Sequence, residues 1–503
     1  MTGNPNKVQT GIAGFDEVTS GGLPQGRTTL LLGGAGSGKT IFALQYIAEG
    51  IRSQHHPAIF VAFEERAERI ASNAASFRWN VAELSKKKLF FLDAQPRPDL
   101  IQLGDFNIDG LLEALDYQIK AMGAKRIVFD ALDVVLALLP DAATRQREVY
   151  RLHEWLLERH VTSLITAKID DFAARNQRNA QNSFGFMQFM VDCAVILNHD
   201  VSHGISQRTI RVLKYRGSSF DENESPFMIN KSGIEVGFAR PVGRHDIRVS
   251  NERVSSGVRQ LDNLLEGGYY RHSCVLIAGE PGSGKSTLAA ACAEAACKRG
   301  ERALLVSFDT DGSEVVRNLS TVGITLGRYV RNGALLMKSA RSIIGSAGAH
   351  FVRIKTLAEE HRANFVIIDP VSTLSRALDD TISHSVTELL IDWAKSEGIT
   401  LICTTLGSEP LLARIKGASF SHLATLSDTL IQLEQEVRDG ERVRHLSIVK
   451  SRGTAHSNKI HNFVLCAQGF VLDVSTRTNA SRSSDGFRRA SASEPRATRL
   501  RNK

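Results

Sequence analysis

The feature that most constrains this chain is a glycine-rich segment that follows a short apolar run near the N-terminus. Residues 28–40 read TTLLLGGAGSGKT and fit the spacing G-x-x-x-x-G-K-[ST], with Gly33 and Gly38 as the fixed glycines. This spacing predicts a strand, a phosphate-binding loop and then a helix. Small residues let successive main-chain N–H groups surround phosphate oxygens, and the start of the helix adds its positive end. The segment therefore predicts a nucleotide site, rather than a glycine-rich turn that merely begins a helix.

A second copy of the motif lies 246 positions further on. Residues 273–287 read SCVLIAGEPGSGKST, and Lys285 stands where Lys39 stands in the first copy. A glycine, an aspartate and a glycine pair repeat upstream at the same offset, namely Gly11 and Gly257, Asp16 and Asp262, and Gly21-Gly22 and Gly267-Gly268. Two motifs in one register indicate a tandem duplication. We therefore expect two domains of one fold, over 1–240 and 241–474.

In each copy the loop residues have defined roles toward a nucleotide and its metal ion. The lysine reaches the β and γ phosphates, and the hydroxyl that follows it ligates Mg²⁺. The residues expected to contact nucleotide are Gly36, Ser37, Gly38, Lys39, Thr40 and Ile41 in the first copy and Gly282, Ser283, Gly284, Lys285, Ser286 and Thr287 in the second. ATP and Mg²⁺ are the expected cofactors, with Thr40 and Ser286 as metal ligands.

The rest of each half repeats one order of elements. We expect helices over 41–51 and 288–298, with strands over 58–63, 126–130, 161–167 and 208–214 in the first half and over 303–308, 365–369, 399–405 and 444–450 in the second. Helices that alternate with continuous apolar strands predict a mostly parallel, doubly wound α/β sheet in each domain. Prolines and glycines interrupt the pattern over 236–251, where we place the domain boundary.

An aspartate ends one apolar strand in each half, downstream of the phosphate loop. Asp130 ends the run RIVFD, and Asp369 ends FVIID. This position is typical of the Walker B carboxylate, which holds Mg²⁺ through water. A strand-end aspartate can also simply cap the next helix, but the presence of both loops favours the metal role for both residues.

A pair of acids ends the strand expected beside the first phosphate loop. A carboxylate at Glu64 or Glu65 can hold an attacking water in line with the γ-phosphate; the alternative is two surface acids that begin a helix. The second half has Asp309 and Thr310 instead, so its carboxylate is one methylene shorter. Because about 1 Å of misplacement can cost about a hundredfold in rate, we expect both sites to bind nucleotide and the first to hydrolyse most of it.

A Lys-x-Arg-Gly sequence ends a late strand in both halves. The two copies are Lys214-Tyr215-Arg216-Gly217 and Lys450-Ser451-Arg452-Gly453. Residues two apart in a strand point to the same face, so each copy presents two cations together. We call Lys214 and Arg216 the first fork, and Lys450 and Arg452 the second fork. A solvated strand end is the plainer reading, but recurrence at one place in both repeats favours a shared function.

Composition limits the other classes of function. Of the 503 residues, 42% are hydrophobic and 23% charged, as is ordinary for globular chains, and no apolar run could cross a bilayer, so we expect a cytoplasmic protein without membrane contact. Six cysteines without C-x-x-C spacing suit reduced, buried thiols.

Most of the net charge of +8 lies in 475–503, which hold seven Arg and one Lys against Asp485 and Glu494. We expect this tail to be disordered, and the near-neutral body argues against nucleic acid as a ligand.

Together the two loops, the Glu64-Glu65 pair, the two forks and the segment 421–429 (SHLATLSDT) resemble the KaiC family of circadian-clock proteins over about residues 8–474. The resemblance implies two RecA-like ATPase domains in a hexameric double ring, with ATP between subunits and a KaiB-like regulator as a candidate partner. It implies an ATPase with catalytic Glu64 and Glu65 in the first ring, and an autokinase and autophosphatase in the second. The further residues that match nucleotide-contacting positions are Ser76, Lys214, Tyr215, Arg216, Lys450 and Arg452, the fork residues reaching a neighbour's nucleotide.

Departures from the family pattern bear on activity. The second glutamate pair is replaced by Asp309-Thr310, which leaves Asp309 as the catalytic candidate there. The adjacent phosphorylated Ser-Thr pair of the family reads Ala424-Thr425, so Thr425 is the one matching phosphoacceptor. Val322 stands where the family has an aromatic contact to adenine, and 475–503 do not show the familiar regulator-binding segment. The two-step phosphorylation cycle of the family therefore cannot operate unchanged.

Three hypotheses follow from the sequence. The first is a KaiC-like ATPase that forms ATP-dependent rings, with Ser/Thr autokinase activity confined to Thr425. The second is a scaffold in which nucleotide mainly joins subunits and catalysis is slight. The third is a DNA-dependent RecA-like motor, which would need basic loops that bear aromatic residues; the near-neutral body argues against it.

Overall fold

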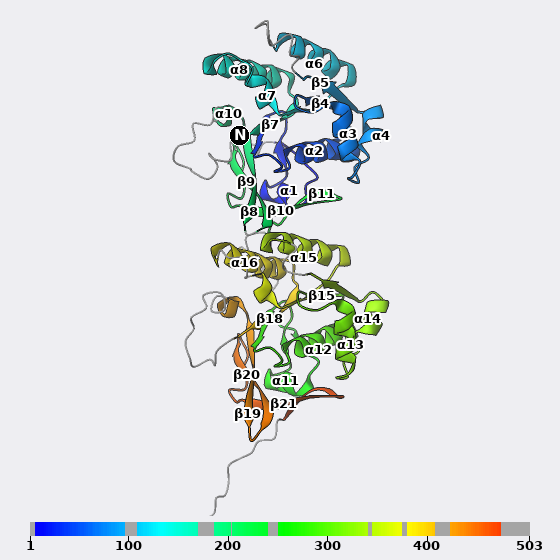
Figure 1. Cartoon of the computed structure of the whole chain (residues 1–503), viewed down its shortest axis with the longest axis vertical. Helices are drawn as coiled ribbons and strands as arrows, with labels where there is room; N and C mark the ends of the chain where they lie inside the picture. The colour runs from blue at the N-terminus through cyan, green and yellow to red at the C-terminus, as the bar shows by residue number, and fades with distance from the viewer. Residues whose placement is uncertain are drawn as a thin grey trace, which may run out of the picture.

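The computed structural model describes residues 6–95, 108–169, 186–202, 204–239, 250–340, 345–374, 380–407 and 423–473, apart from the side chains of Lys87 and 380–385. These residues form two α/β bodies that follow one another along the long axis of the molecule, with the N-terminal body at the top of Figure 1. The tail that the sequence predicts to be disordered, 475–503, lies outside the described residues.

The first body is built on a nine-stranded sheet with the order β11-β10-β9-β8-β3-β7-β6-β4-β5, beside a small sheet of β1 and β2. Strands β8, β3, β7, β6, β4 and β5 run parallel, and β9, β10 and β11 extend the sheet as antiparallel strands. Its strands are β1 Lys7–Val8, β2 Leu23–Pro24, β3 Thr28–Gly33, β4 Ala58–Ala62, β5 Leu89–Asp93, β6 Arg126–Asp130, β7 Thr162–Lys168, β8 Cys193–Ser202, β9 Ile205–Tyr215, β10 Ser225–Asn230 and β11 Gly233–Val236. Its helices are α1 Phe15–Val18, α2 Lys39–Ser53, α3 Ala67–Ala74, α4 Val81–Lys87, α6 Asp109–Met122, α7 Leu132–Leu136, α8 Ala142–Arg159 and α10 Met187–Met190.

The second body repeats this plan with a nine-stranded sheet in the order β16-β15-β17-β18-β14-β19-β20-β21-β22 and a small sheet of β12 and β13. Its strands are β12 Arg253–Val254, β13 Tyr269–Tyr270, β14 Cys274–Gly279, β15 Ala303–Ser307, β16 Leu335–Ser339, β17 Phe365–Asp369, β18 Thr400–Leu406, β19 Thr429–Arg438, β20 Glu441–Ser451, β21 His461–Cys466 and β22 Gly469–Asp473. Its helices are α11 Arg259–Leu264, α12 Lys285–Lys298, α13 Gly312–Ser320, α14 Gly327–Arg331, α15 Ala347–His361 and α16 Asp380–Ser396, with a 3₁₀ turn over Val371–Thr373. Matched strand for strand, the two sheets have one topology, as a duplication predicts.

The strands predicted from apolar runs lie close to the observed ones. β6 and β17 occupy 126–130 and 365–369 as predicted, because nearly all of their side chains are buried and no polar residue interrupts the run. The helices after the phosphate loops begin earlier than predicted, at Lys39 and Lys285. Gly38 and Gly284, the residues before them, have positive φ and end each loop directly before its lysine.

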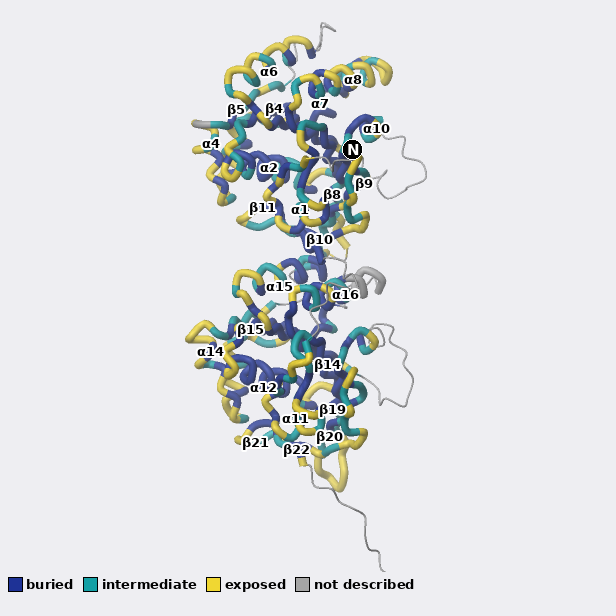
Figure 2. The backbone as a smooth tube through the Cα atoms, turned by 180° about the vertical axis from the view of Figure 1, so that it is seen from behind, coloured by how far each residue is buried: buried dark blue, intermediate teal, exposed yellow. Residues whose placement is uncertain are grey.

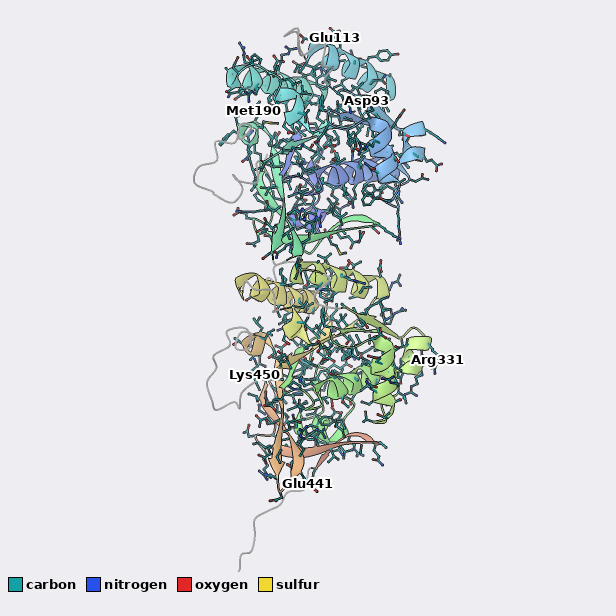
Figure 3. The ribbon with its side chains drawn as sticks, viewed as in Figure 1. Asp93, Glu113, Met190, Arg331, Glu441 and Lys450 are labelled. Atoms are coloured by element: carbon teal, nitrogen blue, oxygen red, sulfur yellow. The ribbon has the colours of Figure 1, made fainter. Side chains whose placement is uncertain are left out.

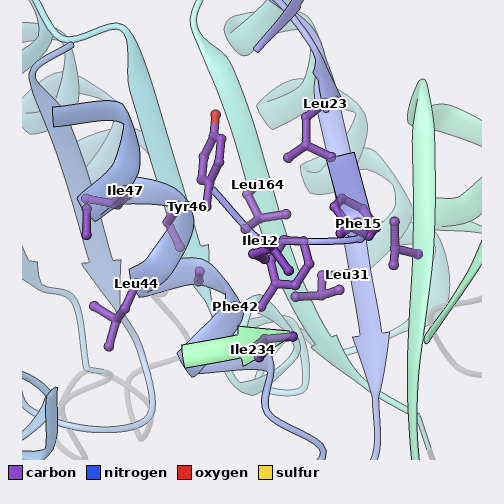
Figure 4. Packing of buried hydrophobic residues seen from close by; sticks show 14 of the residues in the cluster. Ile12, Phe15, Leu23, Leu31, Phe42, Leu44, Tyr46, Ile47, Leu164 and Ile234 are labelled. Carbon is purple, nitrogen blue, oxygen red and sulfur yellow. The ribbon is translucent and has the colours of Figure 1, made fainter. Parts of the chain in front are cut away.

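Alternate residues of each central strand enter two separate cores, one on each face of the sheet. In the first body Leu31 packs with Phe42 and Tyr46 of α2, whereas Leu30 and Leu32 pack beneath α6, α7 and α8. Figure 2 shows the buried strands in the middle of each body and the exposed residues along the outer helices. Figure 4 shows Phe42 beside Ile12 and Phe15, and the rings of Phe15 and Phe42 meet edge to face at 5.1 Å. Helices thus cover both faces, which fixes the strand ends that carry the loops.

The two bodies meet where strands β9 and β10 of the first pack against helix α15 of the second (Figure 1). Thr356 Oγ1 donates to Glu235 Oε2 at 2.9 Å, and Lys355 Nζ donates to the main-chain oxygen of Phe238 at 3.1 Å. A Cβ added to Gly348 would lie 2.5 Å from Cβ of Pro226, so only a residue without a side chain fits at this point of the helix. The last strands of the first body are therefore held directly on a helix of the second.

Two expectations from composition can be compared with the structure. The six cysteines are free thiols, and all but Cys466 are buried, as predicted. Among the helices of the described ranges, none combines the length and the apolar character that crossing a bilayer requires.

Candidate functional site

Each phosphate loop joins the carboxyl end of one central strand, β3 or β14, to the helix behind it. Gly36 and Gly38 have φ of 69° and 106°, and the matching Gly282 and Gly284 have 79° and 101°. Residues with a Cβ rarely adopt such angles, so the glycine spacing is a backbone requirement in both loops. The two loops therefore share one conformation, and it is the conformation that turns main-chain N–H groups toward an anion.

The lysine of each loop lies back over the loop itself. Lys39 Nζ donates to the main-chain oxygens of Gly33 and Gly34, both at 2.8 Å. Lys285 Nζ makes the matching pair of hydrogen bonds at 2.9 and 2.8 Å. Desolvation by burial lowers the pKa of both lysines from the ordinary lysine value. An anion bound in the loop would favour the charged form and oppose this effect of burial.

A buried serine hydroxyl lies within each loop. Ser37 and Ser283 are fully buried, and within the described parts of the chain their Oγ atoms have no hydrogen-bond partner. The first main-chain N–H groups of α2 and α12 also have no acceptor inside their helices. Unpaired donors, a lysine and a positive helix end together fit the phosphates of a nucleotide, and both loops supply all of them.

The Walker B carboxylate of the first site is held by two hydroxyl groups. Asp130 Oδ2 accepts from Thr40 Oγ1 at 2.9 Å, and Asp130 Oδ1 accepts from Thr166 Oγ1 at 2.7 Å. Desolvation by burial raises the pKa of Asp130, although the two hydrogen bonds act in the opposite direction. Hard cations such as Mg²⁺ prefer oxygen ligands of this kind. Thr40 and Asp130, both predicted as metal ligands, therefore lie in direct contact and form a donor set that fits Mg²⁺.

The second site has a related but more open arrangement. Asp369 accepts a hydrogen bond from Thr404 Oγ1, at the place that Thr166 holds in the first site. Asp369 is half-buried, and Ser286 is exposed at the start of α12. Lys285 is near both Asp369 and Asp309, whose charges oppose the effect of burial on its pKa. The predicted residues of the second site thus lie at one edge of the sheet, and its two expected metal ligands, Ser286 and Asp369, are less buried than Thr40 and Asp130.

The two predicted catalytic glutamates of the first site point in different directions. Glu64 Oε1 accepts from Lys168 Nζ at 2.6 Å, and its charge acts on Lys39 in the phosphate loop. Glu65 Oε1 lies 2.7 Å from Arg69 Nε on α3. The structure therefore brings Glu64 to the phosphate loop and turns Glu65 toward α3.

The corresponding acid of the second site follows strand β15. Asp309 is exposed, and the main-chain N–H of Thr310 donates to Ser307 Oγ at 3.2 Å. This hydrogen bond folds the chain back onto the end of β15 directly after the acid. Asp309 thus lies near Lys285 but is one methylene shorter than Glu64.

Two charged residues that the sequence analysis did not single out also lie at the first site. Lys168 is the last residue of β7, in register with Gly33. Asp133 is 8% exposed, lies near the main-chain N–H of Lys168, and has its pKa raised by burial. A signal was present in the sequence, because the strand next to the phosphate-loop strand must end at the same edge. The predicted strand stopped one residue short of Lys168.

Both forks lie at the other end of the sheet from the phosphate loop of their own body. Lys214 is paired with Ala194 of β8, which is itself paired with Leu30 of β3, toward the amino end of that strand. The phosphate loop begins at the carboxyl end of β3, at Gly33. The order of strands is the same in the second body. Each fork therefore lies toward the amino end of the central strand, whereas its own loop leaves the carboxyl end.

The forks make the same contacts in the two bodies. In the first, Lys214 Nζ donates to the main-chain oxygen of Gln188 at 2.9 Å, and Arg216 Nη2 donates to that of Phe189 at 2.8 Å. In the second, Lys450 and Arg452 donate to the main-chain oxygens of Ala424 and Thr425 at 2.6 and 2.7 Å. Figure 3 shows Met190, the last residue of helix α10, and Lys450 on the same side of the molecule, one in each body. Both forks thus hold a short segment at the same edge of the sheet.

The remaining predicted residues have varied environments. Thr425 is exposed, next to the second fork. Tyr215 is buried and its hydroxyl donates to the main-chain oxygen of Gly22 at 3.0 Å, so its side chain faces the core. Ser76 is exposed just after α3, and Val322 packs against the core of the second body.

Known proteins share both halves of this arrangement. The chain matches the family model described as "ATPase: KaiC" over residues 8–240 and 254–475. It belongs to the KaiC family. The circadian clock protein KaiC2 of Synechocystis sp. is 35% identical over 470 residues, which cover 93% of this chain and 81% of that protein. The circadian clock oscillator proteins KaiC of Thermostichus vulcanus and Picosynechococcus sp. are both 34% identical, over 474 and 476 residues, or 94% of this chain and 90% of each relative.

Membership in the family confirms two of the sequence predictions. The two bodies are tandem RecA-like α/β domains, and the chain is an ATP-binding ATPase of the KaiC type. The domain limits at residues 240 and 474, the roles of the individual site residues, and the oligomeric state stay predictions.

Proposed function

We propose that this KaiC-family ATPase hydrolyses ATP mainly in its first domain and uses its second domain mainly to bind ATP. One observation carries the proposal: the two loops share backbone angles and lysine contacts, whereas the acid at the first loop is Glu64 and the acid at the second is the shorter Asp309. Phosphate binding depends on the shared parts. Activation of water depends on the part that differs.

In the first site each step can be assigned to a group of this chain. The loop amides and Lys39 would hold the β and γ phosphates, and Thr40 and Asp130 would hold Mg²⁺. Mg²⁺, when bound, neutralises charge that develops on the γ-phosphate. Glu64 accepts a hydrogen bond from the attacking water, holds it in line with the phosphorus atom and takes its proton as the new bond forms.

The test is phosphate release by the full chain and by two matched variants. Replacing Glu64 and Glu65 together by Gln should lower turnover at least about a hundredfold, whereas Asp309→Asn should lower it less than about twofold. A fluorescent ATP analogue should bind both variants as it binds the native chain. Unchanged turnover in the double variant would refute the catalytic assignment and favour a scaffold in which nucleotide only joins subunits.

We further propose that the chain forms a homohexamer in which each fork reaches the nucleotide of the neighbouring subunit. Each fork lies toward the amino end of the central strands, away from its own phosphate loop, which supports a role toward the phosphates of another copy. The mass of the particle, measured with and without ATP, tests this. Arg216→Ala should reduce ATP-dependent assembly, while Arg208→Ala, on the same strand but outside the fork, should leave it intact; equal behaviour of the two variants would contradict the proposal.

Thr425 is the proposed phosphoacceptor of the second domain. It is exposed and lies beside the second fork, so the phosphate would come from ATP bound to a neighbour. Intact-mass analysis after incubation with ATP should show one added phosphate per chain, and none in Thr425→Ala. Phosphate that persists in this variant would exclude the site.

A further inference from the structure

An ion pair joins the proposed catalytic acid of the first site to a lysine on a nearby strand. Lys168 Nζ lies 2.6 Å from Glu64 Oε1, and this hydrogen bond raises the pKa of Lys168 above the ordinary lysine value. Glu64 follows β4 and Lys168 ends β7, and these two strands flank the Walker B strand β6. The pair therefore spans the edge of the sheet that carries Asp130.

The main chain of Lys168 is fixed from two sides. Its pairing with β3 puts it opposite Gly33, the first fixed glycine of the phosphate loop. Its main-chain N–H lies near the Asp133 carboxylate, which is 8% exposed. The main chain of Lys168 is thus held in place beside the phosphate loop, and its side chain extends from there so that the ammonium group contacts Glu64.

The second site has neither of these two groups. Leu406 occupies the place of Lys168, at the end of β18 and in register with Gly279. Ser372 occupies the place of Asp133, three residues after the Walker B aspartate. The first site, which has Glu64, therefore has both the lysine and the carboxylate beside it. The second site, which has Asp309, has neither.

We propose that Lys168 is a positioning residue that holds Glu64 for ATP hydrolysis, an inference that rests on the function proposed above. A glutamate just beyond the end of a strand has several rotamers open to it. The ion pair selects those in which the carboxylate lies beside Lys39 and Asp130. Because Lys168 binds Oε1, the second oxygen, Oε2, is the one that accepts a hydrogen bond from the attacking water.

A plain surface ion pair would behave differently. The side chains of Lys168 and Glu64 are 42% and 53% exposed, and pairs this exposed contribute little to stability. If the pair were only structural, its loss would change neither melting temperature nor turnover to a measurable extent. A positioning role predicts a large change in turnover without a change in stability.

The experiment uses the full chain with three substitutions. Lys168→Met should lower kcat roughly ten- to a hundredfold, with KM for ATP, binding of a fluorescent ATP analogue and melting temperature unchanged. Lys168→Arg should recover most of the rate, since it keeps the charge. Lys125→Met removes an exposed lysine just before β6, at the far end of the sheet, and should behave as the native chain.

The same Lys168→Met change is then made in a Glu64→Gln background. If Lys168 acts through Glu64, it should have no further effect there, because the group it positions is already disabled. A loss of rate that persists in this background would overturn the proposal in favour of direct contact between Lys168 and phosphate. A change in melting temperature or in ATP binding, with kcat unaltered, would also overturn it.

The proposed function fails in a different way. If Glu64→Gln alone leaves turnover unchanged, the assignment of hydrolysis to Glu64 is wrong, whatever Lys168 does. If Glu64→Gln abolishes turnover and Lys168→Met does not lower it, the function stands and the positioning role is refuted.

Discussion

The two nucleotide sites of this chain agree in their main chain and differ in their side chains. The phosphate loops share positive φ angles at matched glycines and the same lysine hydrogen bonds. The edge around the loops differs at Glu65 and Thr310, and again at the pairs Asp133 and Ser372, and Lys168 and Leu406. In each pair the first site has the charged residue.

This difference shows how a duplicated enzyme can keep binding while its rates diverge. Phosphate binding uses main-chain N–H groups and one lysine, so it survives changes on the neighbouring strands. Hydrolysis needs a carboxylate held to within about an ångström of its working place. The strand ends that supply this carboxylate lie at the surface and can change without disturbing the two cores. Binding thus depends on what the two domains share, and turnover on what differs between them.

The largest expected effect comes from removing one loop lysine at a time. Lys39→Ala should lower turnover at least about a hundredfold, because the γ-phosphate loses its direct cation at the site with Glu64. Lys285→Ala should lower turnover less than about threefold. Phosphate release measures both, and particle mass with ATP shows whether the ring still forms. Equal losses in the two variants would break the comparison, since both sites would then contribute equally.

A smaller effect is expected from converting the second site toward the first. Asp309→Glu together with Thr310→Glu, made in the Lys39→Ala background, should raise the remaining turnover about tenfold, because the longer carboxylate reaches water at the γ-phosphate. The matched control is Asp309→Asn in the same background, which should lower it. If the two glutamates have no effect, the strand-end acid does not decide the rate, and the missing Lys168 equivalent becomes the main difference between the sites.

The sequence could predict the parts of this molecule that depend on local pattern. Buried strands such as β6 and the glycine loops follow from residue order alone, and so does the duplication. The burial of Arg126 does not, because it depends on groups 80 residues away: the arginine is fully buried and donates to the main-chain oxygen of Tyr46 at 2.6 Å, with its guanidinium over the Tyr46 ring.

The divergence of Glu64 and Glu65 could not be predicted for the same reason. Adjacent glutamates look equivalent in sequence, and their directions are set by partners elsewhere in the chain. Lys168 lies 104 residues after Glu64, whereas Arg69 lies one helical turn after Glu65. Only the packing of β7 beside β3 brings the first partner to the site, and that packing is a property of the whole sheet.

The smallest expected effect concerns pH, and it tests the part of the comparison in which the two sites agree. Burial lowers the pKa of both Lys39 and Lys285, and phosphate binding requires the charged form. ATP affinity should therefore hold near neutral pH and fall as the pH rises, earlier than it would for an exposed lysine. We expect a loss of roughly two- to fivefold between about pH 7 and about pH 10 at each site.

Binding of a fluorescent ATP analogue to Lys285→Ala reports the first site alone, and binding to Lys39→Ala reports the second. Similar curves would mean that the two lysines have the same surroundings in solution. A fall at one site only would show that the shared geometry of the loops does not extend to their electrostatics, and binding as well as turnover would then differ between the domains.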